Sequence, residues 1–119
     1  MQLPVRITFR HMDTSAAVEA RVHELAARLT RVSDKIIDCH VTIEAPPAHQ
    51  HKGAPFTVRI DLTGPGGHLS ALKGNSARPE YQDVYVALRD AFDAIKRQLE
   101  ETVRTLRDHT LPRTPLSST

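Results

Sequence analysis

Three stretches of the chain alternate hydrophobic and polar residues with a period of two, which is typical of a strand with one buried side. The three stretches are residues 5–9, 37–43 and 56–63. The Gly-Pro-Gly-Gly sequence at 64–67 predicts a turn. A fourth, weaker strand through about Lys73 would then form a hairpin with the third, because a short turn is the simplest connection between neighbouring strands.

Two other stretches space their apolar residues three and four apart, as an amphipathic helix does. The first stripe begins at Val18, and the helix is expected to end near Ser33-Asp34. Thr14 or Ser15 can cap it, because a hydroxyl accepts from an otherwise unpaired backbone N–H. The second helix is predicted from Tyr81 to about residue 108. Its apolar positions lie within an arc of about 120° and are Tyr81, Val84, Tyr85, Leu88, Ala91, Phe92, Ile95, Leu99, Val103 and Leu106.

The order strand, helix, three strands, helix predicts a two-layer α+β sandwich. The helix between the first two strands suggests a right-handed crossover. Because each helix has one apolar stripe, both must lie on the same face of one four-stranded sheet. Residues 45–55 and 74–80 are predicted loops, residues 1–109 a single domain, and residues 110–119 a flexible C-terminal tail.

Composition narrows the class of protein. The chain has 119 residues, 39% of them hydrophobic and 25% charged, which is typical of a globular domain. We find no apolar run long enough to cross a membrane and no signal peptide, and expect a cytoplasmic protein. Sixteen Lys and Arg against 14 Asp and Glu leave a net charge of only +2. Nucleic-acid binding would therefore depend on where individual charges lie.

Candidate catalytic and metal-binding residues are scattered. Seven histidines include His49 and His51 in the Pro-rich loop, but no spacing typical of a metal site is found. Cys39 lies on the apolar side of the second strand and is predicted to be a small core residue. The 64–67 turn lacks the Gly-Lys-Ser/Thr ending of a phosphate-binding loop. We therefore expect no catalytic residues, no metal and no cofactor.

Basic residues gather on the predicted solvent side of both helices. Such rows of cations could meet successive phosphates of a folded RNA. The alternative is an ordinary solvated surface, since Asp93 and Glu100 could form ion pairs with Lys96, Arg97 and Arg104. From the pattern alone the two interpretations have equal weight. The candidate RNA-binding residues are Arg21, Arg28, Arg31, Lys35, Arg89, Lys96, Arg97, Arg104 and Arg107.

The second helix carries a recognisable signature. Asp83-x-Tyr85-x-Ala87-Leu88, followed by Asp93-x-x-x-Arg97-Gln98-Leu99, resembles the D-x-Y-x-A-I…D-x-x-x-R-Q-L signature of the ribosome hibernation-promoting factor family. This family includes the ribosome-associated inhibitor and is also called the sigma-54 modulation protein family. Further agreements in order and spacing are Ile7-Thr8, Arg10-His11, Ser15 and His40-Val41-Thr42-Ile43, so that the resemblance covers residues 1–108.

The resemblance implies the β-α-β-β-β-α fold, similar to a double-stranded-RNA-binding domain, and a non-enzymatic activity. Family members bind 16S rRNA in the mRNA and tRNA channel of the small ribosomal subunit and inhibit translation as hibernation factors, in stress and stationary phase. Long members add a dimerising domain, and this chain resembles a short member. The implied partners are the small subunit and 16S rRNA, with no DNA, membrane or small-molecule substrate.

The sequence departs from the family at several charged positions. Leu25, Ala94, Glu100 and Glu101 stand where a basic residue is usual, and Lys96 stands where an acid is common. The loss of phosphate contacts would weaken rRNA binding and flatten its dependence on salt.

Three functional hypotheses follow. The first is a hibernation factor whose basic residues meet phosphate and whose Tyr85, Leu88, Phe92, Ile95 and Leu99 form core. The second is a diverged member that acts as a protein-interaction module with weak or no ribosome binding. The third, ranked last, is a small enzyme, which would need a concave site with convergent groups.

Overall fold

The elements follow one another in the predicted order. The computed structural model describes residues 3–46, 55–74 and 79–110. A short 3₁₀ helix, η1, precedes the last helix. In chain order the elements are β1 (Val5–Arg10), α1 (Ala16–Leu29), β2 (Asp38–Glu44), β3 (Thr57–Gly64), β4 (Gly67–Lys73), η1 (Pro79–Gln82) and α2 (Val84–Thr110).

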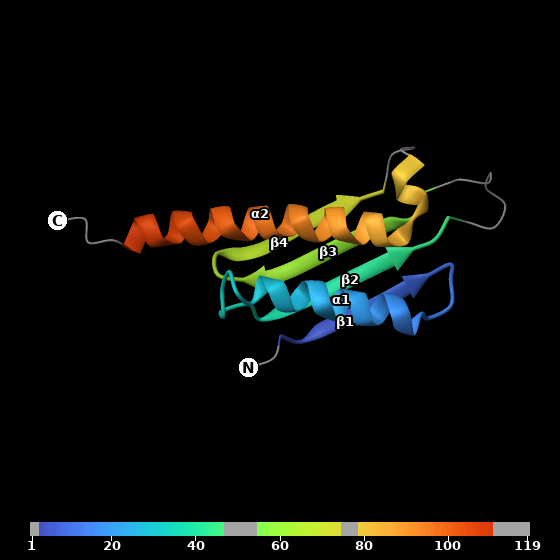
Figure 1. Ribbon diagram of the computed structural model, residues 1–119. Coiled ribbons are helices and arrows are strands. Elements are labelled where there is room, and N and C mark those ends of the chain that lie inside the picture. Colours follow the sequence, from blue (N-terminus) through green and yellow to red (C-terminus); the bar gives the residue numbers. More distant parts are fainter. Residues whose placement is uncertain (1–2, 47–54, 75–78, 111–119) are drawn as a thin grey trace.

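The four strands form one sheet in the order β1-β2-β3-β4. β1 pairs in parallel with β2, as the crossover through α1 requires, and the other two pairs are antiparallel. Both helices cover one face of the sheet and start from the same end of it, and α2 continues beyond the β3–β4 turn (Figure 1). The two-layer α+β architecture is thereby confirmed.

The β3–β4 hairpin depends on a glycine in its turn. Gly64 and Gly67 are paired, which leaves Pro65 and Gly66 as the loop. Gly66 has φ +86°, in the left-handed region that glycine adopts without steric cost. A Cβ atom at this position would also lie 2.8 Å from Thr102 Cγ2 of α2. The tight turn therefore fits closely against the second helix.

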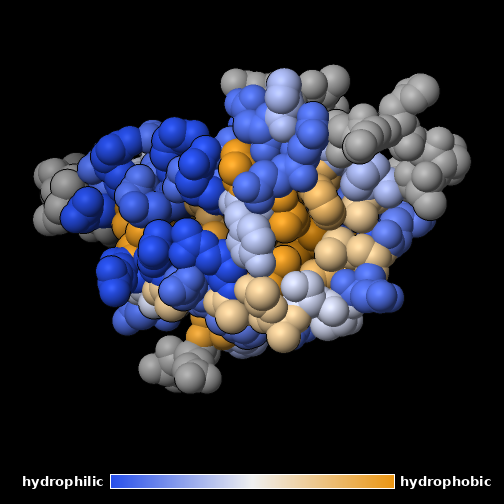
Figure 2. Space-filling model, turned by 45° about the vertical axis from the view of Figure 1, so that its right-hand side comes forward, coloured by the Kyte–Doolittle hydropathy of each residue, from blue (hydrophilic) through white to orange (hydrophobic). Residues whose placement is uncertain are grey.

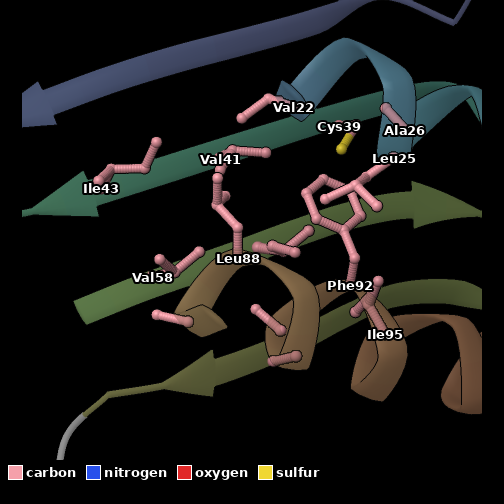
Figure 3. Close-up of a cluster of buried hydrophobic side chains, with 14 of the residues drawn as sticks. Val22, Leu25, Ala26, Cys39, Val41, Ile43, Val58, Leu88, Phe92 and Ile95 are labelled. Carbon is pink, nitrogen blue, oxygen red and sulfur yellow. The ribbon is translucent and has the colours of Figure 1, made fainter. Parts of the chain in front are cut away.

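One hydrophobic core lies between the sheet and the two helices. The inward residues of β2 and β3 are completely buried, and Leu88, Phe92 and Ile95 of α2 pack over them (Figure 3). α1 contributes Leu25, which lies beside Phe92 in the close-up (Figure 3). The fully buried strand residues are Cys39, Val41, Ile43, Val58, Ile60 and Leu62.

Cys39 is a core residue, as predicted. Its side chain is buried, and the removal of the thiolate from water raises the pKa of Cys39 to about 12, with Asp38 and Asp61 as further causes. A catalytic or metal-binding thiol would need a lowered pKa and access to solvent. Cys39 therefore fills space between the sheet and the helices.

We predict that the free energy of unfolding falls as the pH rises above about 9. Below this pH the thiol is protonated in both states; above it the thiol ionises only in the unfolded chain, until the pH passes the folded pKa of about 12. The expected contribution is at most about 1.4 kcal/mol per pH unit. Urea unfolding of the wild type and of Cys39→Ala between pH 8 and pH 11 isolates it, because other titrating groups are common to both. Equal pH slopes for the two proteins would refute the prediction.

α1 begins as predicted but ends earlier. The Ser15 hydroxyl accepts from the backbone N–H of Val18 at 3.2 Å, so Ser15 is the N-cap. The predicted end near Ser33-Asp34 is wrong, since α1 ends at Leu29. The Thr30 hydroxyl and backbone N–H both donate to the Ala27 carbonyl, which tightens the last turn and closes the helix.

Replacement of Ser15 by alanine is expected to lower the free energy of unfolding by about 1 kcal/mol, because it leaves a helix N–H without its acceptor. Urea unfolding followed by circular dichroism measures the change. Ser15→Asp is the matched control and should retain most of the stability, since its carboxylate also caps. Equal losses in both variants would contradict this role of the hydroxyl.

The second helical segment is interrupted where a continuous helix was predicted. Tyr81 lies in η1, where it is buried, and α2 starts only at Val84. Asp83 separates them: its carboxylate accepts from the backbone N–H of Tyr85 at 2.9 Å, and its carbonyl accepts from Val86 and Ala87. Asp83 thus acts as the start signal of α2.

Three apolar residues lie outside the core that their patterns predicted. Tyr85 is 42% exposed, so its prediction as core is wrong, whereas Leu88, Phe92, Ile95 and Leu99 are buried as expected. Ile37, directly before β2, is 66% exposed, and Leu106 in the last part of α2 is 36% exposed. The predicted tail began at Thr110, which instead ends α2, and the end of the predicted 74–80 loop forms the start of η1. The rest of that tail, from 111, and parts of the predicted loops (47–54 and 75–78, including His49 and His51) lie outside the described residues.

Candidate nucleic-acid interface

The nine candidate basic residues all lie at the surface of the helix layer or directly after it. Eight are exposed and Arg21 is half-buried. Five belong to α2: Arg89, Lys96, Arg97, Arg104 and Arg107. On α1 the structure corrects the predicted single row, because only Arg21 and Arg28 are helical and Arg31 and Lys35 follow the helix end.

The basic residues of α2 form two stripes. At about 100° per residue, Arg89, Lys96 and Arg107 fall within about 20° of one another, beside buried Phe92. Arg97 and Arg104 form a second stripe on the outer side, also within about 20°. Carboxylates of α2 separate and flank the stripes, so α2 alternates in charge around its exposed half. They are Asp90, Asp93, Glu100, Glu101 and Asp108.

The first stripe of α2 and the cations of α1 are on facing sides of the two helices. One side of α1, with Ala26, Ala27 and Thr30, lines a hollow beside Leu3 and Val5 at the β1 edge. The opposite side carries Arg21 and Arg28 next to Leu25, and therefore faces α2. The stripe of Arg89 and Lys96 lies beside Phe92, which packs with Leu25 (Figure 3). Cations from both helices thus border the same interhelical space.

Several of the candidate cations form ion pairs with carboxylates of the same helix. Arg21 pairs with Glu24 at 2.8 Å, Arg89 with Asp90 at 3.1 Å, and Lys96 with Glu100 at 4.0 Å. Arg104 pairs with Glu101. Each pair is at least partly exposed to solvent, so it contributes about 0–1 kcal/mol and can rearrange at low cost. In the part of the chain that the structure describes, Arg28, Arg31, Lys35 and Arg97 form no ion pair.

The predicted partners within α2 were wrong in detail. The sequence suggested Asp93 with Lys96 or Arg97, and Glu100 with Arg104, yet within residues 79–110 Glu100 pairs with Lys96 and Arg104 pairs with Glu101. Each charged residue has several possible partners three or four residues away. Which pair forms depends on the side-chain torsion angles, which the sequence spacing does not give. Asp93 is left without an ion pair there, as is Arg97.

The open face of the sheet carries a balanced set of charges. Arg6 donates to Asp38 at 2.8 Å across β1 and β2, and this hydrogen bond holds the pKa of Asp38 below its usual value. Asp61 contacts both Arg59, at 3.2 Å, and His68, at 3.2 Å. Arg6 and Arg59 on this face are matched by neighbouring carboxylates, and Arg10 forms no ion pair among the described residues. Most of the cations without an ion pair therefore lie on the helix side.

Two contacts that the hydrophobic pattern did not reveal join α2 to the sheet and to η1. The Gln98 side-chain amide donates to the Ser70 carbonyl of β4 at 2.9 Å. The Tyr81 hydroxyl donates to Asp90 at 3.0 Å, which ties η1 to α2. The only sequence signal for the first contact was the position of Gln98 within the Arg97-Gln98-Leu99 motif. Together they orient the helix that carries most of the candidate cations.

Over residues 3–46, 55–74 and 79–110, no group of three or more His, Cys, Asp or Glu residues is arranged to hold a metal ion. The helices in the same ranges are not long and apolar enough to cross a membrane.

The fold is shared with solved bacterial proteins. The N-terminal domain of Protein Y from Thermus thermophilus superposes with a TM-score of 0.64 at 21% identity, over 85% of this chain and 98% of that one. A ribosomal subunit interface protein from Coxiella burnetii superposes with a TM-score of 0.63 at 17% identity, over 83% and 96% of the two chains. At such low identities these superpositions show a common fold alone.

Comparison with curated proteins finds no match. A family model, described as sigma 54 modulation protein / S30EA ribosomal protein, matches residues 5–107, which is most of the chain and includes β1, α1, most of α2 and the Asp83–Leu99 signature. The chain therefore belongs to the sigma 54 modulation protein / S30EA ribosomal protein family.

Proposed function

We propose that this protein is a ribosome-associated translation inhibitor that binds 16S rRNA in the mRNA and tRNA channel of the small ribosomal subunit. Membership of the S30EA ribosomal protein family supports an action on the ribosome. One of the two structural neighbours, the ribosomal subunit interface protein from Coxiella burnetii, agrees with this action. The activity is non-enzymatic, and its place is the cytoplasm of cells under stress or in stationary phase.

The observation that carries the proposal is the group of cations without ion pairs on the helix side, Arg28, Arg31, Lys35 and Arg97. A cation without a carboxylate partner keeps its full charge for a phosphate, and its binding releases condensed counterions from the RNA. The paired cations Arg21, Arg89, Lys96 and Arg104, with Arg107, complete the proposed surface by exchanging weak ion pairs for phosphates.

The acidic residues of α2 set the strength of the interaction. Glu100 and Glu101 draw Lys96 and Arg104 into local pairs. Fewer phosphate contacts make the logarithm of the affinity less dependent on salt. We therefore expect moderate binding that weakens less with salt than that of a uniformly basic surface.

Inhibition of cell-free translation tests the proposed mechanism. The purified chain should reduce synthesis when it is added before mRNA and tRNA, because its body would occupy their channel. Small subunits already loaded with mRNA and tRNA should resist it. If inhibition is equal in both orders of addition, the channel is not the site of action.

The second candidate function is a protein-interaction module with weak or no ribosome binding. The alternation of acidic and basic stripes on α2 favours it, since such a surface suits a charged protein partner as well as RNA. Strong salt dependence of binding to small subunits would argue against this candidate, and absence of binding would favour it.

A further inference from the structure

Tyr85 is an exposed aromatic residue at the start of α2. It is 42% exposed, whereas Leu88, one turn later on the same helix, is fully buried. Its backbone is fixed, because its N–H donates to the Asp83 carboxylate at 2.9 Å. Its hydroxyl forms no hydrogen bond with any residue that the structure describes. The ring thus presents an anchored but unpartnered surface to solvent.

Cations continue the stripe on which Tyr85 lies. Arg89 is four residues later, about 6 Å along the helix axis, and Lys96 lies within about 20° of Tyr85 around the axis. The ion pair of Arg89 with Asp90 is partly exposed and that of Lys96 with Glu100 is exposed, so both cations can exchange partners at low cost. An aromatic ring and two cations therefore share one side of α2, the side that faces α1.

The opposite helix leaves room at this level. α1 and α2 start from the same end of the sheet (Figure 1), so the first turns of the two helices lie at a similar level along it. On the facing side of α1 the first turn carries Ala17, which is small and exposed. Figure 2 shows hydrophobic surface toward the end where the helices begin and a predominance of hydrophilic residues toward the C-terminal half of α2.

A ligand for this place must combine a flat apolar face with negative charge. A nucleotide does so, since its base stacks on aromatic rings and its phosphates bind Arg and Lys. The base must be unpaired, because the faces of bases inside a duplex are already stacked. We propose that Tyr85 is a stacking platform for an unpaired nucleobase of RNA, with Arg89 and Lys96 on the adjacent phosphates. This inference rests on the proposed function and adds a specific contact to it.

Titration of the labelled full-length chain with purified small ribosomal subunits tests the proposal. Three variants are compared with the wild type: Tyr85→Phe, Tyr85→Leu and Tyr85→Ala. Loss of base stacking lowers affinity by about 5- to 100-fold. We expect this loss for Leu and Ala, and affinity within about twofold of the wild type for Phe, which keeps the ring. Circular dichroism and urea midpoints verify that the variants are folded.

The other outcomes are distinct. If Leu binds like the wild type and Ala does not, Tyr85 makes an apolar contact with protein and the stacking proposal is wrong. If all variants bind equally, Tyr85 lies outside the interface, while the proposed function stands as long as charge reversal of Arg28 and Arg97 weakens binding. If the wild type itself does not bind, both the proposed function and the stacking site fail.

Discussion

Replacement of Arg28 and Arg97 by glutamate in one variant is expected to lower the affinity for small ribosomal subunits by about 100-fold at near-physiological salt. Both residues are exposed and form no ion pair among the residues described, so each is available to a phosphate. Reversal removes two contacts and adds two repulsions. The slope of log affinity against log salt should fall by about two.

The control for this variant changes the same amount of charge on the other side of the molecule. Arg10 and Arg59 lie on the open face of the sheet, away from the helices. The variant Arg10→Glu/Arg59→Glu should bind subunits with nearly the affinity and salt slope of the wild type. A loss as large in the control as in the helix variant would mean that net charge, or the sheet face, accounts for binding.

Replacement of Phe92 by alanine should lower the free energy of unfolding by about 3–5 kcal/mol, the largest stability effect expected of a single change here. Phe92 is 3% exposed and packs between α1 and the sheet, beside Leu25 (Figure 3). The substitution removes a large apolar surface and leaves a cavity that rigid strands on one side cannot fill. Urea unfolding followed by circular dichroism measures the loss.

Tyr85→Ala is the matched control for Phe92, since it removes another aromatic ring from the same helix. Tyr85 is partly exposed and outside the core, so its removal should change the free energy of unfolding by less than about 1 kcal/mol. Similar losses for the two variants would show that α2 is seated differently on the sheet. A small loss for Phe92→Ala alone would show a core that collapses around the missing ring.

The fold could be predicted from the sequence because the apolar residues of its strands and helices recur at regular spacings. In Val5–Arg10 and Asp38–Glu44 the apolar residues alternate with polar ones, so only one side of each strand can face the helices. This requirement fixes the pairing register of the two strands as well as their positions. The ends of elements depend on single hydrogen bonds. The Thr30 hydroxyl closes α1 before the apolar pattern ends, and the Asp83 carboxylate starts α2 after Tyr81. The spacing of apolar residues does not show where these hydrogen bonds form, so it does not give the ends of the helices.

The candidate surface could be predicted only in part. Helical spacing placed Lys96 and Arg97 outside the core, and the structure confirms that both are exposed. The helical spacing did not reveal that Lys96 faces α1 while Arg97 faces outward. These directions depend on how α2 lies on the sheet, where Gln98 bonds to β4. Tyr85 was placed in the core because it falls in the apolar arc. The first turn of α2 leaves the side facing α1 open, so the ring remains exposed.

Co-sedimentation of the purified chain with isolated small and large ribosomal subunits, from low to near-physiological salt, tests the central claim most directly. We expect the wild type to pellet with small subunits and to remain partly bound near physiological salt, while the Arg28→Glu/Arg97→Glu variant stays in the supernatant. The wild type should not pellet with large subunits alone. Absence of the wild type from the small-subunit pellet even at low salt would contradict the account and leave a family fold that serves a protein partner.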